Sequence, residues 1–285
     1  MVSRMQIAIL GTGAIGSSFA YQLARAGHTV TVIARGARLE QLQRDGAIVL
    51  FSGERAAVQV SAALDDRTPY DLVLVTVLAS QVGSVLPALG ASAARTVMFM
   101  FNTFEALDPL RDAVGAQRFA FGFPGGVFAL LLDGKLKTQI RSGTTAGDAT
   151  WAKSFTDAGI PTVVEQDMHG WLRSHAALVI PLMAIGTVVV RRGAGISWRE
   201  AGAYAAAMDT AFRIVRELGN AITPSMVLTV SRLPQALVKA LLWAMSRTTT
   251  LRDLGRLGPT EARMLIDMMT TAAPGKTAAL LAIRP

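Results

Sequence analysis

The sequence predicts an α/β protein in two parts, a parallel-sheet domain over residues 1–167 and an all-helical domain over residues 168–285. A chain of 285 residues has the length of about two domains. Up to Gln166, short β-branched runs alternate with amphipathic stretches of helical length, which favours β-α-β units and a parallel sheet. After Met168, long windows rich in Ala, Leu and Met keep a helical period with almost no strand signal.

Apolar, β-branched runs predict the strands of the first domain. We expect them at Ile7–Leu10, Thr29–Ile33, Leu72–Val77, Thr96–Phe101, Arg118–Gly122 and Thr162–Glu165. A short strand at Val58–Val60 and the stretch Gly125–Ile140 are predicted to form hairpin-like additions, because Asp133-Gly134 is a turn signal between two apolar runs.

Helical periodicity and capping residues predict the elements of the second domain. Helices are expected across Trp198–Leu218, Met226–Met245 and Pro259–Met269. Ser197, with Glu200 three residues later, has the pattern of a capping box. Thr223 followed by Pro224 predicts a helix start with proline at the first helical position.

Composition excludes several classes of protein. The absence of cysteine removes disulfide frameworks, thiolate metal sites and cysteine nucleophiles, so redox chemistry needs a cofactor, and we predict no metal site. The formal charge is 28 − 20 = +8, but the basic residues are scattered and aromatic residues make up only 6% of the chain. Nucleic-acid binding would favour clustered basic residues interleaved with aromatic ones, so no nucleic-acid partner is expected.

Two apolar segments could be mistaken for membrane or export signals. The run from Met5 to Ala20 is interrupted by three regularly placed glycines and is interpreted as a strand and a turn. The uncharged run Ala176–Val190 is shorter than the ~20 residues of a membrane span and contains Pro181, so a buried helix is expected. We therefore predict a cytoplasmic protein without stable membrane insertion.

The most specific motif is a glycine-rich turn between a strand and a helix. It consists of Gly11, Thr12, Gly13, Ala14, Ile15 and Gly16, all predicted to contact a cofactor. A strand, these glycines, a helix and a second strand within about 30 residues form a dinucleotide-binding arrangement. Gly11 permits the tight turn, Gly13 lets the backbone approach a pyrophosphate, and Gly16 allows close helix packing. The sequence thus predicts a Rossmann-like domain.

The residues after the second strand indicate which dinucleotide binds. NAD enzymes usually place Asp or Glu there to bind the ribose 2′-hydroxyl, whereas this chain has Arg35 and no acidic residue until Glu40. A guanidinium makes bidentate charge-assisted hydrogen bonds to phosphate. We therefore predict NADPH as the cofactor, with Arg35 on its 2′-phosphate and Arg38 as either a second contact or a solvated loop residue.

Several stretches together resemble the ketopantoate reductase (2-dehydropantoate 2-reductase) family. They are ILGTGAIGSSFAYQLARAGHTVTVIARGARLEQLQRDG, DLVLVTVLASQV, FMFNTF, FGFPGG and WLRSHAALVIPL. The resemblance implies a Rossmann domain followed by a helical domain, with NADPH and substrate bound between the two. It also implies cofactor-site roles for Gln81, Asn102 and Glu261, whereas Leu78 stands where members of the family commonly have Lys.

The resemblance also indicates a departure at the catalytic position. The family presents a catalytic Lys from a helix, with Asn residues one and two turns later, and these positions fall on Arg173, Ala177 and Pro181. A guanidinium is a poor proton donor, but Arg173 could polarise a carbonyl or clamp a carboxylate. His175 is the alternative acid. Two residues along a helix rotate about 200°, so Arg173 and His175 should face different sides. Catalytic roles are thus predicted for Arg173, His175 and Asn102.

The leading hypothesis is an NADPH-dependent oxidoreductase that reduces a ketone, either a 2-oxo acid or a bulkier, less polar carbonyl compound, and not ketopantoate itself. The alternative is a non-catalytic NADP-binding sensor or scaffold that lost its proton donor. A third hypothesis, a protein that binds a membrane surface or a partner, rests on the apolar composition, with 51% hydrophobic residues. A homodimer accounts for the same composition more simply, so the expected partners are a small-molecule substrate and a second copy of the chain.

Overall fold

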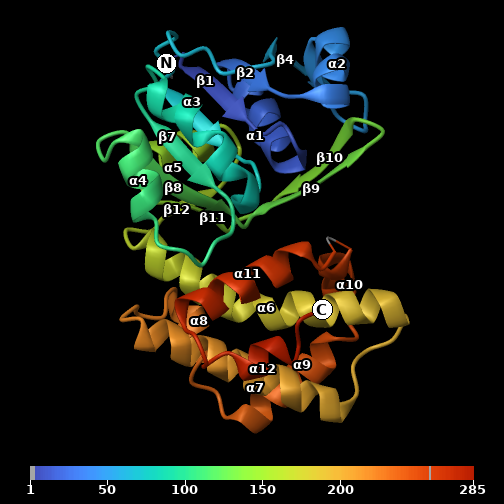
Figure 1. Ribbon diagram of the computed structural model, residues 1–285. Helices are drawn as coiled ribbons and strands as arrows, with labels where there is room; N and C mark the ends of the chain where they lie inside the picture. The colour runs from blue at the N-terminus through green and yellow to red at the C-terminus, as the bar shows by residue number, and fades with distance from the viewer. Residues whose placement is uncertain (1–3, 257) are drawn as a thin grey trace. The chain divides into compact units, whose positions relative to one another are not determined.

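The computed structural model describes residues 4–256 and 258–285 (Figure 1). The chain forms two compact units. The first unit contains the chain up to Phe101 together with Leu107–Met168, and the second contains Asn102–Ala106 together with His169–Pro285. The short segment 102–106 therefore packs with the helical half of the chain, which a single boundary after residue 167 does not anticipate.

The first unit is a Rossmann-like domain built on an eight-stranded sheet, ordered β12-β11-β8-β7-β6-β1-β2-β5 (Figure 1). The strands are β1 (Gln6–Leu10), β2 (Thr29–Ile33), β5 (Gln59–Ser61), β6 (Leu72–Val75), β7 (Val97–Met100), β8 (Phe119–Pro124), β11 (Thr144–Ala146) and β12 (Thr162–Val164). In register, Ile7 of β1 lies between Val30 of β2 and Leu72 of β6, and all three side chains are buried. Strands buried on both faces are apolar throughout, which explains their continuous β-branched runs.

The sheet is mostly parallel, with one exception. Strand β11 runs antiparallel to β8, with Thr145 opposite Phe123. The chain returns between these strands through a hairpin rather than through a crossover helix, so a parallel pairing is not required. The predicted parallel sheet is confirmed, with this antiparallel pair at its edge as the exception.

That hairpin is formed by β9 (Val127–Leu132) and β10 (Lys135–Ile140). Its two-residue turn consists of Asp133, with φ of 47°, and Gly134, with φ of 75°, the left-handed pair that a tight hairpin turn needs. Beside it, β3 (Ala47–Val49) and β4 (Arg55–Ala57) form a second small antiparallel pair. The turn signal predicted this hairpin correctly. The expectation for Val58–Val60 is wrong, because β5 pairs parallel with β2 at the edge of the main sheet and forms no hairpin-like addition.

Helices of the first unit pack against the sheet. They are α1 (Ala14–Arg25), α2 (Gly36–Asp45), α3 (Leu86–Ala91), α4 (Asp108–Val114) and α5 (Ala149–Asp157), with a short 3₁₀ helix η1 (Ala79–Ser84). Phe19 of α1 and Phe155 of α5 are fully buried and meet edge to face, with ring centroids 5.2 Å apart. These side chains join α1 and α5 in one core with the strands β1, β2 and β6.

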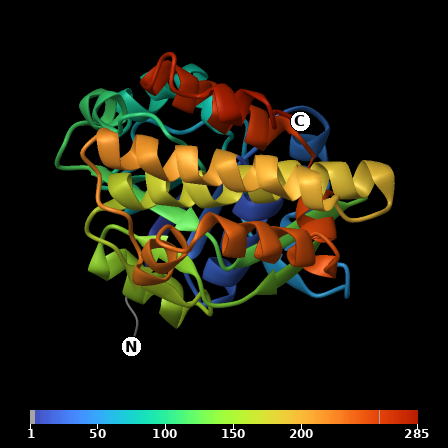
Figure 2. The same cartoon turned by 90° about the horizontal axis from the view of Figure 1, so that it is seen from below.

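The second unit is all-helical apart from segment 102–106. Its helices are α6 (Met168–Arg192), α7 (Trp198–Glu217), α8 (Ser225–Val230), α9 (Gln235–Met245), α10 (Thr249–Gly255), α11 (Thr260–Ala272) and α12 (Ala278–Leu281). The two long helices α6 and α7 (Figure 2) supply much of the core, including Ala184, Ile185, Met208 and Phe212. The predicted window Met226–Met245 is two helices, because Pro234 lacks the amide that would continue the first one.

Helix α6 contains the predicted buried run. Among the described residues, it is the one helix long and apolar enough to cross a bilayer, and more than half of its most apolar window is buried inside the protein. Pro181 lies inside the helix without ending it. Burial in the core of the second unit explains its low polarity, as for a core helix.

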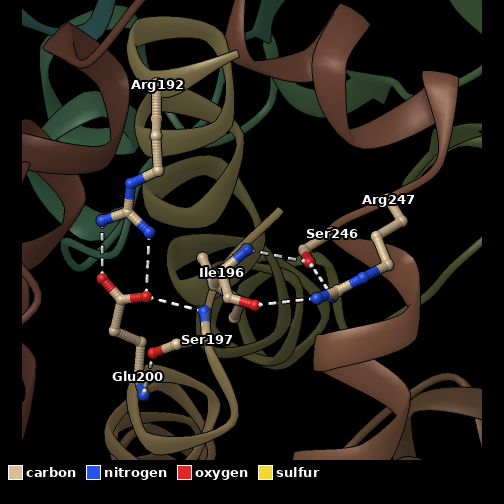
Figure 3. A network of polar contacts seen from close by, with 6 residues as sticks. All are labelled: Arg192, Ile196, Ser197, Glu200, Ser246 and Arg247. Atoms are coloured by element: carbon tan, nitrogen blue, oxygen red, sulfur yellow. Dashed lines mark hydrogen bonds and ion pairs between the residues drawn. The ribbon is translucent and has the colours of Figure 1, made fainter. Parts of the chain in front are cut away.

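Figure 3 shows how the connection from α6 to α7 is held. Arg192 donates two hydrogen bonds, of 2.9 and 2.7 Å, to the carboxylate of Glu200, which lowers the pKa of Glu200 to about 2. Ser197 and Glu200 form the predicted capping box, since each accepts a hydrogen bond from the other's backbone amide. Ser246 accepts a hydrogen bond from the amide of Ile196, which ties the connection to the end of α9. The sequence predicted the capping box but not the hydrogen bond between Ile196 and Ser246.

The predicted start of the helix at Thr223 is displaced by one residue, because Pro224 is the N-cap of α8 rather than its first residue.

Candidate functional site

Two glycines of the turn after β1 are required by the protein's own packing. Gly11 has a φ of 101°, and a Cβ there would lie 2.8 Å from Cγ1 of Val77. A Cβ at Gly16 would lie 2.3 Å from the carbonyl oxygen of Gly11 and 2.5 Å from Oγ1 of Thr76. These residues let β1, α1 and the end of β6 meet without a side chain between them.

Gly13 differs, because no atom of the described residues fills the space beside it. Its φ is −70°, which any residue can adopt, and a Cβ there would have no atom within 4 Å. Gly13 is also the N-cap of α1, and no side chain caps this helix. The uncapped amides at a helix N-terminus attract an anion, and the open space lets it approach the backbone. This arrangement fits the pyrophosphate of a dinucleotide.

Neighbouring strands hold the turn in place. Thr12 is buried, and its hydroxyl donates a hydrogen bond of 2.7 Å to the carbonyl of Ile33 at the end of β2. From β6, the Thr76 hydroxyl donates a 2.7 Å hydrogen bond to the carbonyl of Gly11. Strand order reverses at β1, where β2 and β6 lie on opposite sides, and such a switch point is where open α/β sheets bind ligands.

Two further predicted cofactor residues lie at the same carboxyl edge of the sheet. Arg35 follows β2 as the exposed N-cap of α2, and its side chain makes no hydrogen bond or ion pair with the described part of the chain. Gln81 lies on η1, is exposed, and accepts a hydrogen bond of 3.3 Å from the amide of Leu78. Arg35 is therefore the available cation at the end of β2.

Arg38 is not the solvated loop residue that one of its two expectations described. It lies on α2, and its guanidinium donates hydrogen bonds within the first unit. Desolvation lowers the pKa of Arg38.

In the second unit, Asn102 and Glu261 form a hydrogen-bonded pair. Asn102 is buried, and Glu261 lies in the first turn of α11. Burial raises the pKa of the Glu261 carboxyl, and the hydrogen bond from the Asn102 amide offsets part of that effect. The side-chain oxygen of Asn102 has no hydrogen-bond partner within the residues described. A buried acceptor without a partner is costly, so this pair is suited to a ligand that donates a hydrogen bond.

Arg173, on α6, binds to other parts of the second unit. Its Nε donates a hydrogen bond of 3.2 Å to the carbonyl of Phe104, and Nη1 donates one of 2.7 Å to Oδ1 of Asn220. The guanidinium also lies over the Phe104 ring, 5.2 Å from its centroid. Arg173 thus fixes the segment 102–106, which carries Asn102. Sequence reasoning did not find Asn220, which has no recognisable motif around it.

His175, also on α6, contacts Trp171 rather than the partners of Arg173. Its ring stacks on Trp171 one turn earlier, with centroids 5.0 Å apart and planes at 7°. Desolvation lowers the pKa of His175 to about 4, so the ring is neutral at pH 7. A neutral imidazole can donate a hydrogen bond or accept a proton, but it is not a cationic acid. Ala177, at the position where the family has its first Asn, is fully buried in the core.

The structure groups the predicted residues within each unit. The first unit brings together the glycine turn, Arg35 and Gln81 at one sheet edge, and the second brings together Asn102 and Glu261. Asn102 is joined directly to Phe101, the residue after β7. Among the described residues, no cluster of three or more His, Asp or Glu side chains could hold a metal ion.

Comparison with protein families agrees with this geometry. The model of the family described as "Ketopantoate reductase PanE/ApbA" matches residues 7–150, about half of the chain. The chain belongs to this family. The resemblance that the sequence motifs indicated is thereby confirmed, and the family is named for an oxidoreductase that acts on a keto group.

Two curated relatives carry the name 2-dehydropantoate 2-reductase. The protein from Mesorhizobium japonicum is 41% identical over 88 residues, which cover 30% of this chain and 26% of the relative. The protein from Bacillus subtilis is 32% identical over 111 residues, which cover 38% of this chain and 36% of the relative. The matched stretches thus span well under half of either relative.

Solved structures match over nearly the whole chain at low identity. A PanE/ApbA family ketopantoate reductase from Ralstonia eutropha has a TM-score of 0.73 and 23% identity, covering 98% of this chain and 97% of that one. D-mandelate dehydrogenase with NADH and anilino(oxo)acetate has a TM-score of 0.69 and 15% identity, covering 98% of both chains. These likenesses establish the shared fold.

Proposed function

We propose that this protein is an NADPH-dependent reductase of a ketone, either a 2-oxo acid or a bulkier, less polar carbonyl compound. The observation that carries the proposal is the open space at Gly13, at the uncapped N-terminus of α1. The names of the curated relatives and the NADH-bound mandelate dehydrogenase support the reaction class.

NADPH is favoured over NADH by the residues after β2. Arg35 is exposed and is unpaired within the described residues, at the position where a ribose 2′-hydroxyl would otherwise meet an acidic side chain. A 2′-phosphate would receive bidentate hydrogen bonds from it. Gln81 and the amides of the glycine turn, Thr12–Gly16, complete the proposed cofactor contacts.

When bound, a nicotinamide supplies a hydride to the carbonyl carbon, so the protein must stabilise or protonate the developing alkoxide. Burial raises the pKa of Glu261, which favours the protonated form that a carboxylic acid proton donor needs. The unpartnered oxygen of Asn102 would accept a hydrogen bond from the substrate or the nicotinamide amide. Arg173 holds the segment that carries Asn102 and supplies positive charge.

The proposed substrate differs from 2-dehydropantoate. Arg173 stands at the family's lysine position and already binds Phe104 and Asn220. Ala177 is fully buried and offers no polar group. A site with fewer polar contacts favours a larger or more apolar carbonyl compound. His175, neutral and stacked on Trp171, would act as a hydrogen-bond donor or as a positioning group.

We also propose a cytoplasmic homodimer. A dimeric ketopantoate reductase from Staphylococcus aureus shares the fold at a TM-score of 0.68 and 13% identity. Burial of most of the apolar window of α6 supports its role as a core helix rather than a membrane span.

The test is dinucleotide binding followed by turnover. NADPH and NADH affinities are measured by fluorescence titration, and NADPH oxidation is then followed against a panel of 2-oxo acids and bulkier ketones. We expect NADPH to bind more tightly and one substrate class to turn over. Arg35→Ala should weaken NADPH far more than NADH. Tight binding without turnover of any compound would favour the non-catalytic sensor or scaffold, and no binding would refute the cofactor assignment.

A further inference from the structure

Arg38 connects three separate parts of the first unit. Its Nε donates a hydrogen bond of 3.2 Å to the carbonyl of Thr12 in the glycine turn, and Nη2 donates one of 2.9 Å to the hydroxyl of Ser17 on α1. Nη1 donates bonds of 2.9 Å to the carbonyl of Gly134 and to Oε1 of Gln41. All three guanidinium nitrogens are therefore engaged by the protein.

Gly134, which accepts a hydrogen bond from Arg38, belongs to a hairpin that is also hydrogen-bonded to α1. The carbonyl of Gly134 lies in the left-handed turn of the β9–β10 hairpin. Further along the hairpin, the hydroxyl of Ser18 on α1 donates a hydrogen bond of 2.9 Å to Oγ1 of Thr138. The hairpin thus holds the start of α1 twice, once directly and once through Arg38.

Separate hydrogen bonds hold the two ends of the glycine turn. At Gly11, the carbonyl accepts hydrogen bonds from the Thr76 hydroxyl and the Gly13 amide. Gly13 has no side chain and no described atom near its Cβ position, and no side chain caps α1. At Thr12, the hydroxyl donates to the carbonyl of Ile33, and the carbonyl accepts from the Ser17 hydroxyl at 3.3 Å and from the Arg38 guanidinium at 3.2 Å. Binding a phosphate through backbone amides requires those amides to point one way before the ligand arrives.

We propose that Arg38 is a positioning residue for the dinucleotide site, which orients the glycine turn through the Thr12 carbonyl and is itself held by the hairpin. This inference rests on the proposed dinucleotide binding. Arg38 acts on the pyrophosphate-binding backbone, which NADPH and NADH share, and does not bind the 2′-phosphate. That contact belongs to Arg35, whose guanidinium is exposed.

Three arginines around one helix allow a matched experiment. Arg38→Met removes the guanidinium but keeps the length of the stem, Arg35→Met removes the exposed cation at the N-cap of α2, and Arg44→Met removes an exposed cation from the last turn of α2. Dissociation constants for NADPH and NADH are measured for each, and melting temperature reports folding. Hydrogen exchange of the Gly13 and Ala14 amides is measured without any dinucleotide.

Arg38→Met is expected to raise both dissociation constants by the same factor, at least about tenfold, since it removes charge-assisted hydrogen bonds that order the turn. It should also accelerate exchange at Gly13 and Ala14. Arg35→Met should weaken NADPH alone, and Arg44→Met should change neither constant. Arg38→Lys should recover part of the loss, because an ammonium can reach one of the four acceptors but not all.

Two results would overturn the proposal. A selective loss of NADPH in Arg38→Met would make Arg38 a direct phosphate ligand, and unchanged affinities and exchange in a folded variant would make it a stability residue only. If Arg38→Met does not fold, the same dissociation constants and exchange rates are measured for Arg38→Lys and Ser17→Ala, each of which loses fewer hydrogen bonds. Failure of the wild-type protein to bind either dinucleotide would instead refute the proposed function.

Discussion

Arg173 donates a hydrogen bond of 2.7 Å to the side-chain oxygen of Asn220, which follows the end of α7. The same guanidinium bonds the carbonyl of Phe104, so one side chain joins α6 to two other segments of the second unit. Its position resembles that of a catalytic lysine, but its contacts are those of a residue that also maintains the fold.

The Arg173–Asn220 bond should therefore contribute measurably to stability. We expect a double-mutant cycle with Arg173→Met, Asn220→Ala and the double variant to give a coupling free energy of about 1–3 kcal/mol in urea unfolding. The reason is that losing either partner leaves a half-buried polar group less well bonded. Additivity of the two single changes within about 0.5 kcal/mol would show that the bond contributes nothing.

Gly13 and Gly16 should respond in opposite ways to the same added methyl group. Gly16→Ala is expected to destabilise the fold by about 1–3 kcal/mol, because its Cβ meets a backbone oxygen at 2.3 Å. Gly13→Ala should leave the melting temperature nearly unchanged and weaken NADPH binding at least about tenfold, since the Cβ occupies the space proposed for phosphate. Calorimetry and fluorescence titration measure both quantities. Unaltered NADPH affinity in Gly13→Ala would refute the placement of the pyrophosphate.

The raised pKa of Glu261 predicts a pH dependence of turnover. As a proton donor, Glu261 is active while protonated, so kcat/KM should fall as pH rises through its pKa. Glu261→Gln should lower turnover by about 10²- to 10⁴-fold and remove that decline. Glu105→Gln, at an exposed position in the same unit, is the matched control and should keep the wild-type profile. Retention of the decline in Glu261→Gln would assign it to another group.

The lowered pKa of His175 predicts a loss of stability in acid. The folded pKa of about 4 lies below the ordinary value of 6.5, so the unfolded chain takes up the proton first. The stability that neutral His175 contributes is present above pH 6.5 and is lost as pH falls to about 4, by up to about 3 kcal/mol. Urea unfolding at several pH values measures how the free energy of unfolding falls with pH. His175→Phe, which keeps a ring against Trp171, should make this fall smaller. An equal fall in the wild-type protein and the variant would contradict the assignment to His175.

Local sequence patterns were sufficient to predict most of the fold. The six main predicted strands are confirmed, with ends that differ by at most two residues, and so are the hairpin at Asp133-Gly134 and the capping box at Ser197. The strands β3, β4 and β11 were missed because three residues are too few to show a period, whereas the equally short β5 and β12 were found from their β-branched residues. The antiparallel partner of β8 was missed because strand pairing is not a local property.

The glycine spacing and Arg35 were available from the sequence because a dinucleotide-binding turn is built from neighbouring residues. Tertiary structure alone decided what the remaining polar residues do. Arg38 meets Gly134 across 96 positions, and Arg173 meets Phe104 across 69 and Asn220 across 47. A guanidinium looks the same in a sequence whether it faces a phosphate, a carbonyl or water. Its role is set by which acceptors the folded chain brings within about 3 Å and by how much water remains around them.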